Sequence, residues 1–138
     1  MKTAQLTRRG EKLRVLVVED HALIALDLQT MIEELGGEVI EIASSGEDAV
    51  TLTPELRPDV VLMDVRLAGM IDGIDAATAV AQVPGTALIF ITGKADPITL
   101  RRIGELGPLH VVRKPVLAND LLEAICEACR LDCAPASR

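Results

Sequence analysis

The sequence predicts an α/β fold in which a five-stranded parallel sheet is covered by five helices. Five short apolar runs alternate with five segments of helical periodicity along the 138 residues. Strands that alternate with helices form a parallel sheet with helices on both faces. No repeat or linker interrupts this alternation, so we expect one domain over residues 13–131. Residues 1–12 are expected to be a flexible lead-in, and residues 132–138 a flexible tail.

The strands are recognised as short runs rich in valine, leucine and isoleucine. In chain order they are "LRVLVVED" (13–20), "EVIEIAS" (38–44), "RPDVVLMD" (57–64), "TALIFITG" (86–93) and "LHVVRKP" (109–115). The third contains four apolar residues in succession, Val60 to Met63, which is typical of a strand buried on both faces. A charge at the end of such a strand is costly, so the position of Asp64 calls for a chemical explanation.

The helices are recognised by apolar spacing and by start and stop signals. Their sequences are "HALIALDLQTMIEELGG", a segment begun by "SSGEDAV", "IDAATAVAQV", "DPITLRRIGEL" and "NDLLEAICEACRL". Apolar residues in the first recur at intervals of four, three and four: Ile24, Leu28, Met31 and Leu35. Gly36 and Gly37 end that helix, and "SSGEDAV" carries a capping signal. In the fourth helix, Asp96 is the expected N-cap and Pro97 the first residue.

Composition and charge narrow the class of protein. The net charge is −7 and the pI is near 4.8, which disfavours a nucleic-acid partner because such binding depends on clustered Lys and Arg. No apolar run approaches the roughly 18 residues of a membrane span, and residues 1–12 do not form a secretory signal. We therefore expect a cytoplasmic protein that binds neither membrane nor nucleic acid.

Three cysteines, Cys126, Cys129 and Cys133, lie close together near the C-terminus. Their odd number and the lack of an export signal indicate free thiols in a reducing compartment. A structural zinc site would need four ligands, and no fourth Cys or His lies nearby in the sequence. We interpret the cysteines as small apolar residues on a packing face or a subunit contact.

Polar residues capable of chemistry stand at the ends of four predicted strands. Glu19-Asp20 stand at the C-terminal end of the first, Asp64 at that of the third, Thr92 at that of the fourth and Lys114 at that of the fifth. In parallel α/β sheets these ends meet at one edge, where ligands bind. Clustered carboxylates repel one another unless a cation joins them, and an all-oxygen ligand set favours Mg²⁺. A carboxylate at the centre of such a cluster can attack phosphorus and form an acyl phosphate.

These residues resemble the receiver (CheY-like) domain of two-component response regulators, in its single-domain form. The matching marks are the acidic pair in "VVED", "PDVVLMD", "DG" at residues 72–73, "FITG" and "KP". They cover the chain from about residue 12 to 130. The resemblance implies a flavodoxin-like, doubly wound (βα)5 fold and a phosphorelay protein that is not an enzyme, beyond its self-catalysed phosphoryl transfer and dephosphorylation.

The resemblance also assigns a role to each matching residue. Asp64 would accept a phosphoryl group from a histidine kinase or a phosphotransfer protein. Asp20 and Asp64 would bind Mg²⁺ directly, Glu19 would bind it through water, and the backbone carbonyl of Arg66 would complete the protein ligands. Thr92 and Lys114 would contact the phosphoryl group. Pro115 would follow a cis peptide bond.

The sequence departs from the family pattern at three places. Val111 stands three residues before the lysine, where receivers usually carry Tyr or Phe; either His110 replaces that aromatic through a local shift, or the relay is missing. The loop from Asp64 to Gly73 is one residue longer than usual and lacks its proline. Arg66 and Lys94 occupy the positions that tune phosphate lifetime in the family. We expect a longer-lived phosphate, because a basic group can hinder the attacking water.

Three functions remain open on the sequence alone. The first is a phosphorylation-dependent switch that changes contacts with a downstream protein, with a possible homodimer through the stripe Leu122, Cys126 and Cys129. The second is a receiver-like binding module that works without phosphate. The third is an aspartyl-nucleophile phosphatase of the haloacid-dehalogenase type, which would need an acid where Arg66 stands.

His21, at the start of a helix, is interpreted as a surface or capping residue and not as a metal ligand.

Overall fold

A computed structural model describes residues 6–67, 69, 71–93, 97–106 and 110–131. Its main sheet has five strands: β3 (Arg14–Val18), β4 (Glu38–Ala43), β5 (Val60–Asp64), β6 (Ala87–Thr92) and β7 (His110–Arg113). Their order is β4-β3-β5-β6-β7, and every neighbouring pair is parallel. Within the described residues no helix has the length and apolar character that crossing a membrane requires.

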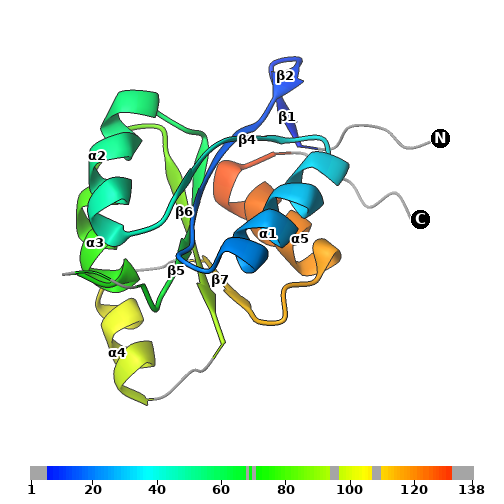
Figure 1. Cartoon of the computed structure of the whole chain (residues 1–138). Helices are drawn as coiled ribbons and strands as arrows, with labels where there is room; N and C mark the ends of the chain where they lie inside the picture. The colour runs from blue at the N-terminus through cyan, green and yellow to red at the C-terminus, as the bar shows by residue number, and fades with distance from the viewer. Residues whose placement is uncertain (1–5, 68, 70, 94–96, 107–109, 132–138) are drawn as a thin grey trace.

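Five helices cover the two faces of this sheet (Figure 1). They are α1 (Ala22–Glu34), α2 (Gly46–Leu56), α3 (Gly73–Val80), α4 (Pro97–Glu105) and α5 (Ala118–Cys129). The buried side chains of α1 and α5 join the core on one face, and those of α2, α3 and α4 join the core on the other. The predicted parallel sheet with five helices is therefore confirmed.

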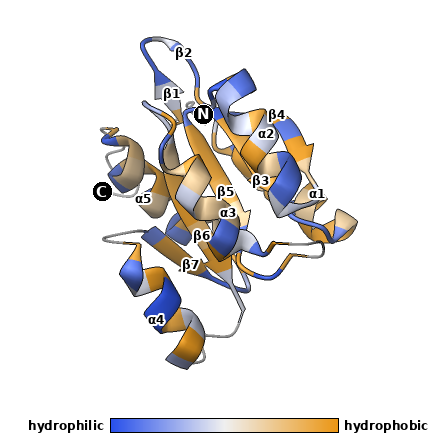
Figure 2. Cartoon of the chain, turned by 90° about the vertical axis from the view of Figure 1, so that its left-hand side faces the viewer, coloured by the Kyte–Doolittle hydropathy of each residue, from blue (hydrophilic) through white to orange (hydrophobic). Residues whose placement is uncertain are grey.

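Strand periodicity explains why both cores form. Successive side chains of a strand point to opposite faces. On β5, Val60 and Leu62 enter the core beneath α1 and α5, whereas Val61 and Met63 enter the core beneath α2 and α3. All five residues of β5 are buried, as its apolar run predicts, and Figure 2 shows the central strands in hydrophobic colours.

Local signals set most helix ends as expected. Ser45 caps α2 by accepting a hydrogen bond from the Asp48 amide at 3.1 Å. Gly36, just after α1, has a φ of +97°. Pro97 is the first residue of α4, while its expected N-cap, Asp96, lies outside the described residues. The Lys114–Pro115 bond is cis, as the family resemblance implied.

The expected lead-in, residues 1–12, contains regular structure from Leu6 onward. Strands β1 (Thr7–Arg8) and β2 (Glu11–Lys12) form an antiparallel hairpin whose turn has positive φ at Arg9 and Gly10. Leu6 is fully buried, and its amide donates to the Leu35 carbonyl at 2.9 Å. The hairpin was not predicted because its strands are short and polar.

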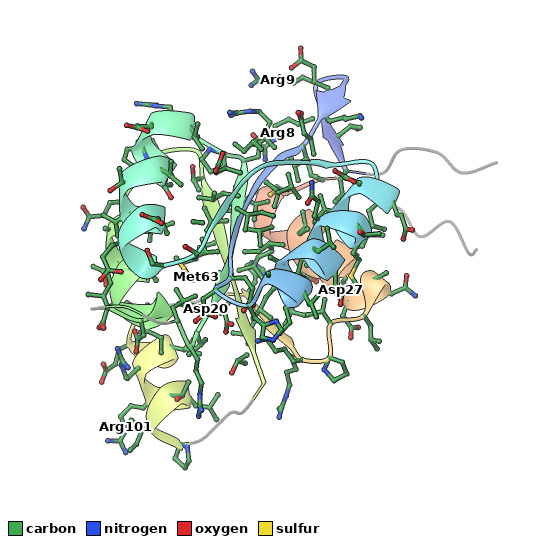
Figure 3. The ribbon with its side chains drawn as sticks, in the orientation of Figure 1. Arg8, Arg9, Asp20, Asp27, Met63 and Arg101 are labelled. Carbon is green, nitrogen blue, oxygen red and sulfur yellow. The ribbon has the colours of Figure 1, made fainter. Side chains whose placement is uncertain are left out.

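A polar network closes the edge of the sheet at the N-terminal ends of the strands. Asp59 accepts the Arg8 guanidinium at 3.1 Å and the Arg14 amide at 2.8 Å. The Arg8 guanidinium also donates to the Cys129 carbonyl at 2.9 Å, and Arg14 donates to the Arg57 carbonyl at 2.7 Å. This network joins the hairpin to the ends of α2 and α5. Figure 3 shows Arg8 near the top of the molecule and Asp20 below it, close to the middle of the view.

The cysteines on α5 are buried against the sheet. Cys126 and Cys129 are part of the core beneath α1 and α5, so they do not provide an exposed dimer face, and the packing interpretation is confirmed for both. Cys129 is a free thiol, and burial raises its pKa to about 11. Cys126 is disulfide-bonded, which corrects the expectation that it is free. Cys133 lies outside the described residues.

Candidate phosphoacceptor site

Three carboxylates meet at the C-terminal edge of the sheet. Glu19 follows β3 and Asp64 ends the neighbouring strand β5, whose register pairs Val18 with Met63. Each of Glu19, Asp20 and Asp64 offers an oxygen within 4.8 Å of the others. Glu19 and Asp64 are buried, whereas Asp20 is exposed. The predicted acidic cluster is therefore a real arrangement in space, with Asp20 on its solvent side.

Glu19 carries the clearest electrostatic signature of this cluster. Burial, together with the neighbouring Asp64 carboxylate, raises the pKa of Glu19 to about 7. One of its oxygens accepts the His21 amide at 3.1 Å. The other, Oε1, is buried and has no hydrogen-bond partner among the described residues; Lys114 Nζ lies 3.8 Å away. A buried oxygen without a donor, in a ligand set made only of oxygens, fits a hard divalent cation such as Mg²⁺.

Asp64 is held at the centre of the site by contacts on both of its oxygens. Oδ1 accepts the backbone amide of Arg66 at 3.1 Å, and Oδ2 lies 3.2 Å from Lys114 Nζ. Lys114 is in turn fixed to β6, because its amide donates to the Thr92 carbonyl at 2.8 Å. The carboxylate is thus oriented by a backbone donor and a cation before any ligand arrives.

Thr92 ends β6 beside this carboxylate. The register of β5 and β6 pairs Asp64 with Ile91, so Thr92 lies one residue further toward the open edge. Thr92 itself is buried, and Gly93 follows it next to the side chain of Lys114. Thr92 therefore joins Glu19, Asp64 and Lys114 at the same edge of the sheet, as the strand-end pattern predicts.

Gly73 explains one mark of the sequence in physical terms. A Cβ at this position would lie 2.0 Å from the carbonyl oxygen of Asp64, so only glycine fits. The Gly73 amide donates to the Val65 carbonyl at 3.1 Å. The start of α3 thus packs directly on the backbone of Asp64.

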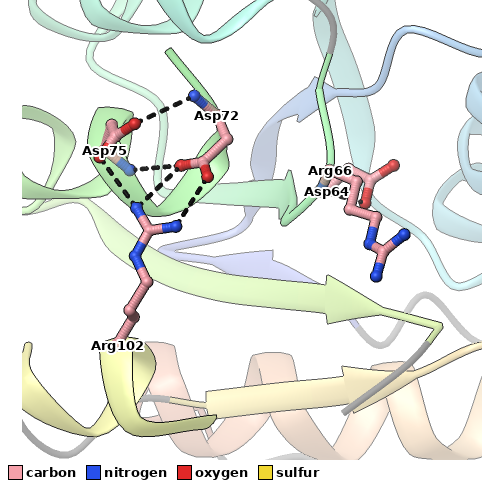
Figure 4. A network of polar contacts seen from close by, with 5 residues as sticks. All are labelled: Asp64, Arg66, Asp72, Asp75 and Arg102. Carbon is pink, nitrogen blue, oxygen red and sulfur yellow. Dashed lines mark hydrogen bonds and ion pairs between the residues drawn. The ribbon is translucent and has the colours of Figure 1, made fainter. Parts of the chain in front are cut away.

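Two polar side chains that the sequence did not reveal hold the loop between β5 and α3. Glu47, on the first turn of α2, accepts the Ile71 amide at 3.2 Å, and its carboxylate occupies the space that a side chain at Gly69 would need. At the other end of the loop, Arg102 of α4 binds Asp72 and Asp75 (Figure 4). Glu47 lies 24 residues from Ile71, and Arg102 lies 30 residues from Asp72, so no local motif could indicate either pairing.

Of the two positions expected to tune phosphate lifetime, the structure describes one. Arg66 is exposed and follows Asp64 by two residues, and Lys94 lies outside the described residues. The pairing of β6 with β7 runs without a break from His110 to Arg113, with His110 opposite Ile89 and Val111 opposite Phe90. His110 lies 3.8 Å from Glu127 of α5, and Val111 is partly exposed.

A groove of about 690 Å³ opens beside the site, between α1 and the segment that follows β7. Its walls are mainly apolar, with Ile24, Leu28 and Met31 on α1 and Val116 opposite. Lys114 lies at its edge, so the groove reaches the neighbourhood of Asp64.

Comparison with known proteins places this arrangement in a family. The family model described as "Response regulator receiver domain" matches residues 15–126. The transcriptional regulatory protein PdtaR of Mycobacterium tuberculosis is 37% identical over 112 residues, which cover 81% of this chain and 54% of that protein. The phyllosphere-induced regulator PhyR of Methylorubrum extorquens is 31% identical over 115 residues, which cover 83% of this chain and 42% of that protein. The chain thus spans about half the length of these curated relatives.

Solved structures agree with this assignment. The signal receiver domain of a modulated diguanylate cyclase from Desulfovibrio desulfuricans superimposes with a TM-score of 0.81 at 37% identity, over 87% of this chain and 95% of that one. The response regulator domain of Thermotoga maritima CheB gives a TM-score of 0.74 at 27% identity, over 88% of this chain and 99% of that one. The family model covers most of the chain, and the chain belongs to the response regulator receiver domains.

Proposed function

We propose that this chain is a phosphorylation-dependent switch in which Asp64 accepts a phosphoryl group from a phosphohistidine of a sensor kinase or a phosphotransfer protein. In this step a carboxylate oxygen of Asp64 attacks phosphorus, a P–O bond forms, and the P–N bond to the donor histidine breaks. The imidazole leaves and takes a proton from solvent. The observation that carries the proposal is the buried Asp64 carboxylate, held by the Arg66 amide and Lys114 at the edge where β3, β5 and β6 end.

The residues of the site would have different roles in this transfer. Asp20, Glu19, Asp64 and the Arg66 carbonyl would hold Mg²⁺, which neutralises charge on the transferring phosphoryl oxygens when it is bound. Lys114, already within 4 Å of both Asp64 and Glu19, supplies a second positive charge at the same place. Thr92, at the end of β6, would hydrogen-bond a phosphoryl oxygen once it is attached.

Phosphorylation would change the balance of charge at this edge. A phosphoryl group converts the Asp64 carboxylate into an acyl phosphate and adds negative charge and acceptor oxygens beside the buried Glu19, and it competes with Glu19 for Lys114. Residues that rearrange around it would alter the surface offered to a downstream protein, as in other local electrostatic switches. The groove beside Lys114 is where a phosphodonor protein would approach, because it opens next to the accepting carboxylate.

The experiment that tests this function is phosphorylation by acetyl phosphate with Mg²⁺, followed by intact mass measurement. We expect the wild type to gain one phosphoryl group and Asp64→Asn to gain none. Omission of Mg²⁺ should prevent the gain. If the wild type stays unmodified with acetyl phosphate and with a phosphorylated donor protein, the chain is instead a binding module that works without phosphate.

A further inference from the structure

Helix α4 is attached to the protein differently from the other four helices. In the described part of the chain its only buried residue is Ile103, whereas each of the other helices buries three or more residues. Two of its larger apolar side chains are exposed, Ile98 at 71% and Leu100 at 51%. Apolar burial scales with the area removed from water, so little of it holds α4 on the sheet.

A polar contact takes the place of that packing. The guanidinium of Arg102 binds both oxygens of Asp72, with Nη1 at 2.9 Å from Oδ2 and Nη2 at 3.3 Å from Oδ1. Its Nη2 also lies 2.9 Å from an oxygen of Asp75 (Figure 4). Burial raises the pKa of Asp72, but hydrogen bonds from Arg102 and from the Asp75 amide outweigh it, and the pKa of Asp72 lies below its usual value.

The two acids that Arg102 binds begin the helix that packs on the phosphoacceptor. Asp72 is the N-cap of α3 and forms a reciprocal capping box with Asp75. Gly73, the next residue, closes directly on the backbone of Asp64. A continuous path therefore runs from α4 through Arg102, Asp72 and the adjoining Gly73 to the backbone of Asp64.

We propose that Arg102 is a positioning residue that holds α4 in its unphosphorylated placement and thereby opposes phosphorylation of Asp64. This proposal rests on the proposed function. A contact present in one arrangement and lost in the other shifts the equilibrium by its difference in free energy, and the effect is reciprocal. If the Arg102 contacts are made in the unphosphorylated arrangement and broken in the phosphorylated one, their removal makes the phosphorylated arrangement easier to reach. Arg102 contacts no reacting atom and acts through the placement of α4.

The chain offers a matched control for this role. Arg101, the preceding residue of α4, is exposed, and Figure 3 shows its side chain directed away from the protein. None of the ion pairs or hydrogen bonds between described residues involves Arg101. Arg101→Gln removes the same charge from the same helix without touching the Asp72 and Asp75 contacts, so general electrostatic effects appear equally in both variants.

The test measures two quantities on the wild type, Arg102→Gln, Arg102→Lys and Arg101→Gln. The first is hydrogen exchange of the α4 amides in the unphosphorylated protein. The second is the rate of phosphoryl uptake from acetyl phosphate with Mg²⁺, followed by intact mass. We expect Arg102→Gln to exchange faster in α4 and to take up phosphate roughly threefold to tenfold faster, with Arg102→Lys intermediate because lysine cannot form the two-pronged contact. Arg101→Gln should match the wild type in both.

Each other outcome has a definite meaning. Equal exchange in Arg102→Gln and Arg101→Gln would show that the contact does not hold α4. Faster exchange with an unchanged uptake rate would show that α4 is held but does not oppose phosphorylation; both results overturn the proposal. If no variant takes up phosphate from acetyl phosphate or from a phosphorylated donor protein, the proposed function fails, and Arg102 loses its positioning role with it. The exchange data then report separately whether the contact holds α4.

Discussion

The two edges of the same sheet are built on opposite electrostatic principles. At the N-terminal edge Asp59 is paired with the Arg8 guanidinium and the Arg14 amide, so its charge is compensated. At the C-terminal edge three carboxylates share a small volume, and Glu19 keeps a buried oxygen without a hydrogen-bond partner among the described residues. The comparison teaches that this chain satisfies its charges where they support the fold. At the proposed phosphoacceptor site, it leaves like charges together.

The C-terminal edge also contains close backbone packing that the fold requires, and Gly73 is the clearest case. The largest effect we expect is from Gly73→Ala, because the new methyl group would meet the Asp64 carbonyl and force the backbone to move. We predict a loss of about 3 kcal/mol in the free energy of unfolding, together with impaired phosphoryl uptake. Gly104→Ala on α4 is the control, since nothing lies within 4 Å of the added group; it should be neutral or stabilising. Equal effects at the two glycines would contradict the close approach described for Gly73.

The paired edge is tested by removing Asp59. Asp59→Ala leaves Arg8 and the Arg14 amide without their acceptor, and we predict a loss of roughly 2 kcal/mol in the free energy of unfolding, measured by urea denaturation. Asp59→Asn should lose less, because an amide oxygen can still accept one hydrogen bond. A stability equal to that of the wild type in both variants would mean that this network does not support the fold.

The crowded edge should appear as a dependence of stability on pH. The pKa of Glu19 is about 7 in the folded protein and near 4.5 ordinarily, so between these values the folded state holds a proton that the unfolded state has lost. The stability from Glu19 is fully present below pH 4.5 and is lost as the pH rises through 7. In EDTA we predict a fall of roughly 2 kcal/mol between pH 5 and 8, beyond that shown by Glu19→Gln. If the free energy of unfolding changed with pH equally in the wild type and in Glu19→Gln, this electrostatic description would be contradicted.

The smallest effect concerns the lifetime of the phosphorylated state. If the exposed Arg66 side chain hinders the attacking water, Arg66→Ala should lose its phosphoryl group roughly threefold faster than the wild type. Intact mass after removal of acetyl phosphate measures this rate, with Arg101→Ala as a control for loss of an exposed arginine. Rapid loss from the wild type that Arg66→Ala leaves unchanged would count against the expected long lifetime.

Features encoded by neighbouring residues could be predicted from the sequence. The run Val60 to Met63 predicts a buried central strand, and strand ends in a parallel sheet must meet at one edge, so the positions of Glu19, Asp20 and Asp64 followed from pattern alone. The Ser45 cap is likewise encoded within a few residues of its partner.

Features that depend on distant pairing could not be predicted. Asp59 binds Arg8 across 51 positions and Arg102 binds Asp72 across 30, and a polar residue carries no local sign of a distant partner. The hairpin could not be predicted because Leu6 is one buried leucine in a polar segment, and Arg8 binds partners far away in the sequence. The disulfide of Cys126 could not be predicted for a related reason, since cysteine spacing does not determine which thiols pair.

The most direct test of the two-edge comparison measures unfolding free energy in EDTA and phosphoryl uptake from acetyl phosphate side by side on Asp59→Ala and Asp64→Asn. We predict that Asp59→Ala loses stability and still gains one phosphoryl group. Asp64→Asn should gain none while it keeps wild-type stability or exceeds it, because the variant removes a carboxylate that repels Glu19. Phosphoryl uptake by Asp64→Asn, or a fold that depends on Asp64 as strongly as on Asp59, would contradict the division of roles between the two edges.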